Sequence, residues 1–162
     1  MKFTHYIGLP GTGKTTLMRE KLAKLRKKEQ DEMVADGPVK YHLFSKQKTI
    51  VFGIYDESTF AGTDRLAKSV GPKFREWVVQ NKELLRDWEL FSEGERFSNN
   101  PTLDHLFEHC DMELVCLVVS EGELARRRAA RNNTQNESWM KGMVTRVSNL
   151  CAKYPHTVEV LG

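Results

Sequence analysis

The sequence Gly8-Leu-Pro-Gly-Thr-Gly-Lys-Thr15 matches the pattern G-x-x-x-x-G-K-[ST] at every position. Glycines at these positions let the backbone curl, so that successive N–H groups point at the oxygens of a phosphate. A helix that starts directly after the loop adds the partial positive charge of its amino end. The stretch therefore predicts a phosphate-binding loop, with ligand contacts expected from Gly8, Gly11, Thr12, Gly13, Lys14, Thr15 and Thr16.

Two side chains of this loop have distinct expected roles. Lys14 can reach the β- and γ-phosphates of a nucleotide, and the Thr15 hydroxyl can ligate Mg²⁺. We therefore expect ATP and Mg²⁺ as ligands. The loop alone does not decide what happens to the phosphate, because such loops serve switches, motors and kinases alike.

The segments around the loop predict an α/β fold. Residues 3–7 are apolar and β-prone, and apolar side chains recur with helical spacing from about Lys14. Residues 39–44 and 49–55 predict an antiparallel hairpin, residues 30–38 a polar loop, and residues 113–119 a central strand buried on both faces. We expect a three-layer P-loop NTPase fold with a mostly parallel five-stranded sheet, and a helix break at Gly71-Pro72.

The composition indicates one soluble domain spanning residues 1–162. The chain has 40% hydrophobic and 29% charged residues and a formal net charge of +3, which is only mildly basic. No apolar run approaches the roughly 18 residues that span a bilayer, and no secretory signal precedes the glycines, so a cytoplasmic location is expected. The three cysteines lack metal-site spacing and are expected to be free thiols.

Acidic side chains follow two of the expected strands. Glu93 stands at the carboxyl end of the strand expected at 88–92, where it could hold Mg²⁺ through water or orient an acceptor. Asp56 follows residues 50–55, and Asp64 is its rival for the carboxylate that takes the proton of an acceptor hydroxyl. Each acid has a plainer alternative: a solvated strand end for Glu93, and capping of a short helix for Asp64.

A basic segment, Arg126-Arg-Arg-Ala-Ala-Arg131, follows the central strand and precedes a polar loop. Arginines beside such a loop suit a lid, expected at about residues 121–138, that neutralises the charge of transferring phosphates. Arg127 and Arg131 share one helical face, and Arg126 is expected to contact the nucleotide. The alternative is a solvated basic helix face.

In its order of elements the whole chain resembles the nucleotide-kinase-like group of P-loop proteins, which includes adenylate, thymidylate and shikimate kinases. The resemblance is specific only at residues 8–15. The stretch Glu93-Gly-Glu-Arg96 is similar to a thymidylate kinase stretch in which an acid and an Asp-Arg pair reach magnesium and acceptor. Glu95 stands where that family has Asp, which puts a direct transfer of roles in doubt.

A narrower resemblance is to small bacteriophage kinases of DNA hypermodification, which phosphorylate 5-hydroxymethyluracil in DNA. It rests on Tyr55-Asp56, Phe60-Ala-Gly-Thr-Asp-Arg-Leu66, Glu93-Gly-Glu-Arg-Phe97 and Ser138-Trp-Met-Lys-Gly142. The resemblance implies DNA carrying a modified pyrimidine as partner, and the cytoplasm of the phage's host as location. Phe60, Phe97 and Trp139 could stack on the base, although each could equally belong to the core.

The sequence therefore predicts an ATP-dependent kinase whose acceptor is a hydroxyl, with 5-hydroxymethyluracil in DNA as the leading acceptor. A kinase of free (deoxy)nucleoside monophosphates or another small metabolite is the alternative within the same class. A nucleotide-binding regulatory switch without an acceptor is the alternative of another class. The sequence leaves the oligomeric state open.

Overall fold

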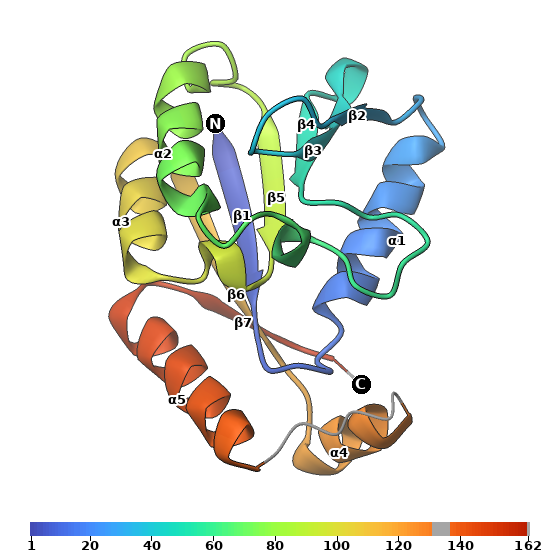
Figure 1. Cartoon of the computed structure of the whole chain (residues 1–162), viewed down its shortest axis with the longest axis vertical. Coiled ribbons are helices and arrows are strands. Elements are labelled where there is room, and N and C mark those ends of the chain that lie inside the picture. The colour runs from blue at the N-terminus through green and yellow to red at the C-terminus, as the bar shows by residue number, and fades with distance from the viewer. Residues whose placement is uncertain (131–136, 162) are drawn as a thin grey trace.

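The computed structural model describes residues 1–130 and 137–161, within which one mixed sheet forms the centre of the molecule (Figure 1). The strand order is β2-β3-β4-β5-β1-β6-β7. The strands are β1 (Lys2–Ile7), β2 (Glu32–Val34), β3 (Tyr41–Phe44), β4 (Thr49–Phe52), β5 (Glu89–Glu93), β6 (Asp111–Val118) and β7 (Thr157–Val160).

β4, β5, β1, β6 and β7 are neighbours in this order and run parallel. β2 and β3 add an antiparallel edge beside β4. β1 lies between β5 and β6, with Tyr6 opposite Glu93 and Ile7 opposite Cys116. The carboxyl ends of these three strands therefore meet at one edge of the sheet. Open α/β sheets bind ligands at this edge, and the loop 8–13 begins there.

Helices cover both faces of the sheet. The α-helices are α1 (Lys14–Arg26), α2 (Val70–Asn81), α3 (Asn100–His109), α4 (Glu121–Ala130) and α5 (Glu137–Lys153). Short 3-10 turns form η1 (Ser45–Gln47), η2 (Thr63–Arg65) and η3 (Glu95–Phe97). Figure 1 shows α1 on one side of the sheet and α2 and α3 on the other.

A separate apolar cluster fills each of the two interfaces. Met18 and Leu22 of α1 pack with Tyr6 and Val115 on one face, while Phe74 of α2 belongs to the cluster on the opposite face. That second cluster also contains side chains of α3 and α5. The apolar faces predicted from helical spacing thus give the three layers expected of a P-loop NTPase.

The predicted hairpin is confirmed, because β3 and β4 pair antiparallel across η1. The strand count of five was wrong, since the described sheet has seven strands. One strand, β2, lies in the segment expected to be a loop. Its residues are half-buried or exposed, so its sequence carries little hydrophobic signal for an edge strand.

A short helical turn and a longer helix are separated as predicted, but the break lies a few residues before Gly71-Pro72. Both residues lie in the first turn of α2, which begins at Val70. Proline fits the first turn of a helix because its missing N–H would have no partner within the helix there.

No helix in the described part of the chain combines the length and apolar character needed to cross a membrane. The three cysteines are free thiols, as expected, and Cys116 is buried in β6.

Candidate active site

The phosphate-binding loop begins where β1 ends and leads into α1. Gly11 and Gly13 have φ angles of 88° and 96°, a backbone region that side chains with a Cβ rarely adopt. A Cβ on Gly8 would lie 2.8 Å from both the Leu117 carbonyl oxygen and Thr12 Oγ1. The glycines are therefore required by the local backbone, two by φ and one by close packing against β6.

Lys14 and Thr15, the two loop side chains predicted to act on the nucleotide, lie at the amino end of α1. Lys14 Nζ donates to the carbonyl oxygens of Gly8 and Leu9, so its ammonium group lies over the loop itself. Thr15 Oγ1 donates to Glu93 Oε1 at 3.3 Å. Thr12 is buried and donates to Leu9 O, whereas Thr16 is exposed on the first turn of the helix.

Glu93 ends β5 with its side chain only 3% exposed. Tyr55 donates a 2.8 Å hydrogen bond to Glu93 Oε1, the oxygen that Thr15 also reaches. Burial raises the pKa of Glu93, although the hydrogen bond from Tyr55 and the charge of Lys14 act in the opposite direction. Burial and the Glu93 charge together raise the pKa of Tyr55 well above its usual value, which keeps the phenol protonated as a donor.

Two further glycines allow the segments around Glu93 to approach closely. A Cβ on Gly62 would lie 2.3 Å from Glu93 Oε1, and a Cβ on Gly94 would lie 2.5 Å from Thr63 Oγ1. Both glycines also have positive φ, 83° and 115°. Thr63 Oγ1 donates to the carbonyl oxygen of Glu93 at 2.7 Å. These contacts bind η2 to the end of β5 and place Asp64 beside it.

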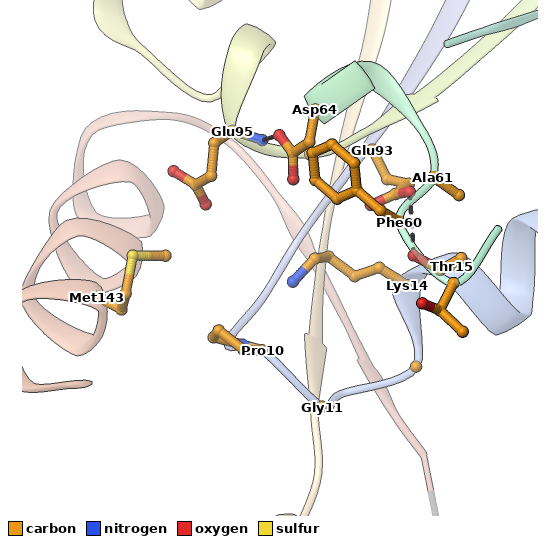
Figure 2. Close-up of a pocket in the computed structure, with 13 residues that line it drawn as sticks. Pro10, Gly11, Lys14, Thr15, Phe60, Ala61, Asp64, Glu93, Glu95 and Met143 are labelled. Atoms are coloured by element: carbon orange, nitrogen blue, oxygen red, sulfur yellow. Dashed lines mark hydrogen bonds between the residues drawn. The ribbon is translucent and has the colours of Figure 1, made fainter. Parts of the chain in front are cut away.

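A cavity of about 340 Å³ lies between the loop and η2. Lys14, Thr15 and Glu93 line one part of it, and Asp64 and Phe60 line another. Figure 2 shows Lys14 between Pro10 on one side and Asp64 and Phe60 on the other. Phe60 is 57% exposed, so its ring is accessible from the cavity side.

The orientation of Asp64 is fixed by the backbone. Its Oδ1 accepts a 2.8 Å hydrogen bond from the N–H of Glu95, and its Oδ2 has no such contact among those described. Arg96 donates to the carbonyl oxygens of Leu66 and Asp64 and so holds η2 against η3. The contacts of Arg96 are therefore structural. Its neighbour Glu95, by contrast, lines the cavity.

Asp56, the rival carboxylate, lies elsewhere. β4 ends at Phe52 instead of reaching Tyr55, and Asp56 lies in the exposed segment beyond it. Arg65 donates to Asp56 Oδ2 at 2.7 Å, and this contact is the largest cause of a lowered pKa of Asp56. Asp56 is absent from the cavity lining, so the geometry favours Asp64 for the role that both were predicted to fill.

The other predicted residues lie in three different settings. Phe97 is fully buried and stacks on Phe74 with ring centroids 3.8 Å apart, so the prediction that it stacks on a base was wrong. Arg126 is exposed on α4 and forms an ion pair with Glu123. The side chains of Arg127 and Trp139, and the whole of Arg131, lie outside the described residues, so their predicted roles stay predictions, as does the lid.

A buried histidine beneath the site was not anticipated. His5 in β1 is 0% exposed, and its ring nitrogens lie 2.6 Å from Ser92 Oγ and 2.8 Å from Ser98 Oγ. Burial, with the charge of Lys14 adding to it, lowers the pKa of His5 to about 3. A neutral histidine therefore connects β1 to β5 and to the turn that carries Glu95.

The donor set fits a magnesium ion that is bound together with a nucleotide. The described residues hold no group of three or more His, Cys, Asp or Glu side chains that could bind a metal by themselves. Mg²⁺ does not need such a group beside ATP, because phosphates and waters complete its shell and one or two protein oxygens suffice. The adjacent oxygens of Thr15 and Glu93 match that requirement.

Comparisons with known proteins agree with this geometry at the level of the family. No match was found among curated proteins. The model of the family P-loop Nucleotide Kinase3 matches residues 1–159, almost the whole chain. The chain therefore belongs to this family of P-loop nucleotide kinases.

Proposed function

We propose that this P-loop kinase transfers the γ-phosphate of ATP to the 5-hydroxymethyl group of 5-hydroxymethyluracil in DNA. The observation that carries the phosphotransfer is the position of Asp64 across one cavity from Lys14 and Thr15. The donor phosphates and the acceptor hydroxyl can therefore meet between them. The motif resemblance and the exposed Phe60 support the choice of acceptor.

The residues of the chain divide the reaction between them. The acceptor oxygen forms a bond to the γ-phosphorus while the bond to the β–γ bridging oxygen breaks, and ADP leaves. Asp64 takes the proton of the acceptor hydroxyl, on the carboxylate oxygen that does not accept from Glu95 N–H. Lys14 and the loop N–H groups neutralise the charge that gathers on the phosphates. Thr15 and Glu93, directly or through water, would hold Mg²⁺, which would supply further charge neutralisation at the same phosphates.

Phe60 suits an acceptor that is a base instead of a small aliphatic metabolite. A base in duplex DNA must leave the stack before its substituent can reach the γ-phosphate, which costs a few kcal/mol. Stacking on an aromatic side chain contributes about 1–3 kcal/mol per base and offsets much of that cost. The ring of Phe60 lines the cavity together with Asp64 and is accessible to such a base.

A free deoxynucleoside monophosphate is the second candidate acceptor. The family description, which names nucleotide kinases, favours this acceptor. The same catalytic residues would act on this acceptor. Only the acceptor's size and its phosphates differ between the two candidates.

The test is transfer of ³²P from γ-labelled ATP to a panel of acceptors. The panel contains DNA with 5-hydroxymethyluracil, the same DNA with thymine, and free nucleotides. Label in the modified DNA alone supports the proposal, and label only in a mononucleotide moves the protein to the nucleotide metabolic kinases. ATP binding without label in any acceptor would overturn the proposed acceptor and favour a regulatory switch.

A further inference from the structure

A second hollow adjoins the cavity described above. It lies between α5 and the turn that leads from η3 into α3, and its volume is about 510 Å³. Glu95 lines both hollows, and the adjacent α5 residues Met143 and Gly142 line the first and the second respectively. Figure 2 shows Glu95 and Met143 together on the side of the first cavity that faces α5. The two hollows are therefore neighbours, separated by Glu95 and the start of α5.

Apart from Leu150, the α5 residues that line the second hollow are polar or glycine and share one face of the helix. Gly142, Thr145, Arg146 and Asn149 recur at helical spacing, so they share that face. Opposite them lie hydroxyl and amide side chains at the start of α3, namely Ser98, Asn99 and Asn100. Arg146 is the one cation among the lining residues that the structure describes.

Arg146 is held in place by a contact that a ligand can replace. Its Nη1 donates to Glu95 Oε2, and the two side chains are 54% and 32% exposed. An exposed ion pair of this kind is weak, because water screens both charges. A guanidinium binds a phosphate with two parallel hydrogen bonds, which is stronger than such a screened contact.

We infer that this hollow binds a phosphate of the acceptor through Arg146, while the reacting group of that acceptor occupies the cavity at Asp64. The inference rests on the proposed function in one respect: the acceptor must carry a phosphate. Two sources supply this chemistry: a phosphodiester beside the modified base in DNA, or the 5′-phosphate of a free nucleotide. Arg146 then exchanges Glu95 for the phosphate when the acceptor binds.

Binding is measured without ATP, so that the result does not depend on transfer. Fluorescence anisotropy follows a labelled short oligonucleotide containing one 5-hydroxymethyluracil, and 5-hydroxymethyl-2′-deoxyuridine 5′-monophosphate competes with it. Arg146→Ala should weaken binding of a phosphate-bearing probe about tenfold, the loss typical of a charge-assisted hydrogen bond. The matched control is Lys153→Ala, which removes a cation from the same helix and also breaks an ion pair with an acid, Asp104 of α3.

A second pair of variants tests the hollow while keeping Arg146 in the sequence. A Cβ on Gly142 would meet nothing within 4 Å, so a side chain can begin there without a clash with the helix. Gly142→Glu should weaken binding several-fold relative to Gly142→Gln, because the added charge repels phosphate and, four residues before Arg146 on the same face, can also pair with its guanidinium. Equal binding by these two variants would overturn the inference.

The outcomes distinguish the two sources of phosphate. They also distinguish failure of the phosphate site at Arg146 from failure of the proposed function. A loss with Arg146→Ala for both probes supports a site for any acceptor phosphate, and a loss for the oligonucleotide alone supports a phosphodiester site. Equal binding by Arg146→Ala and Lys153→Ala for both probes overturns the inference. If DNA is phosphorylated and Arg146→Ala binds it normally, the phosphate site fails and the proposed function stands. If Arg146 is needed for binding but no DNA is labelled, the site stands and the proposed acceptor fails.

Discussion

Tyr55 donates a 2.8 Å hydrogen bond to Glu93 Oε1, although 38 residues separate them in the chain. The contact joins the segment after β4 to the end of β5, and Thr15 of the phosphate-binding loop completes the group at 3.3 Å. Glu93 is consequently a buried carboxylate whose oxygen is oriented before any ligand arrives. Preorientation of this kind is valuable at a metal site, because partners of a ligating group set its direction.

Replacing Glu93 with Gln should preserve or increase the stability of the protein at neutral pH while weakening its activity. Burial raises the pKa of Glu93 above its ordinary value of 4.5, so the folded state binds protons more readily than the unfolded state. Stability contributed by this group therefore falls as pH rises above about 4.5. Glu93→Gln should be at least as stable as the wild type in urea at neutral pH, and should lose that advantage at acidic pH.

The same variant should bind Mg²⁺-ATP about ten- to hundredfold more weakly, because the carboxylate is lost. Titration of phosphotransfer with Mg²⁺ measures this. Glu89→Gln is the control, since Glu89 is exposed at the other end of β5. Unchanged Mg²⁺ dependence in Glu93→Gln would contradict the assignment.

Asp64→Asn should reduce the rate of transfer about 10²- to 10⁴-fold, the range expected for loss of a general base, with little change in ATP affinity. Asn keeps the oxygen that accepts from Glu95 N–H, so the turn should stay intact. Asp56→Asn is the comparison, and should retain most of the activity because Asp56 lies outside the cavity and contacts Arg65. The reverse ranking of the two variants, measured in single-turnover experiments, would identify Asp56 as the base.

Phe60→Ala should raise the KM for the acceptor about tenfold or more, as expected from stacking worth about 1–3 kcal/mol. The KM for ATP should change little, because the proposed contact is with the base. Leu84→Ala removes a similarly exposed apolar side chain, 76% exposed and absent from the cavity lining, and should be neutral. Equal acceptor KM values for all three proteins would exclude a stacking role for Phe60.

Protonation of His5 should destabilise the protein in mild acid. The folded pKa of about 3 lies below the unfolded value of 6.5, so between these pH values the unfolded state binds the proton more readily. The contribution is fully present above about pH 6.5 and decreases towards pH 3, by at most about 1.4 kcal/mol per pH unit.

Urea unfolding at several pH values tests this prediction. His5→Gln should be less stable at neutral pH, because the Gln amide cannot make both of the hydrogen bonds that the two ring nitrogens of His5 make with Ser92 and Ser98. Its stability should nevertheless depend less on pH than that of the wild type. His156→Gln is the control at an exposed histidine. Parallel pH profiles for His5→Gln and the wild type would contradict the prediction.

Local sequence was sufficient to predict the phosphate-binding loop and the α/β class. Each glycine of the loop is required by the backbone conformation or packing of the loop itself. The spacing of apolar residues within each strand and helix predicts that element. Glu93 was also predictable as a strand-end acid. Its partner Tyr55 was not, because the contact depends on how β4 and β5 pair in the sheet.

The failures had equally physical causes. Phe97 follows the Glu93 turn closely and was predicted to face a ligand, but η3 directs its ring into the core against Phe74. His5 interrupts an apolar strand with a polar side chain, and only the structure shows that Ser92 and Ser98 satisfy it. The edge strand β2 is too short and too exposed to produce a pattern in the sequence.

The most direct test of the phosphotransfer claim compares the wild type with Lys14→Met for label transfer from γ-³²P-ATP to 5-hydroxymethyluracil DNA. Lys14 is the cation of the loop and lines the cavity opposite Asp64, so its loss removes charge neutralisation at the transferring phosphate. We expect a loss of transfer of about a thousandfold or more, with circular dichroism and the urea midpoint showing a folded protein. Transfer at the wild-type rate by a folded Lys14→Met protein would contradict phosphotransfer at this site.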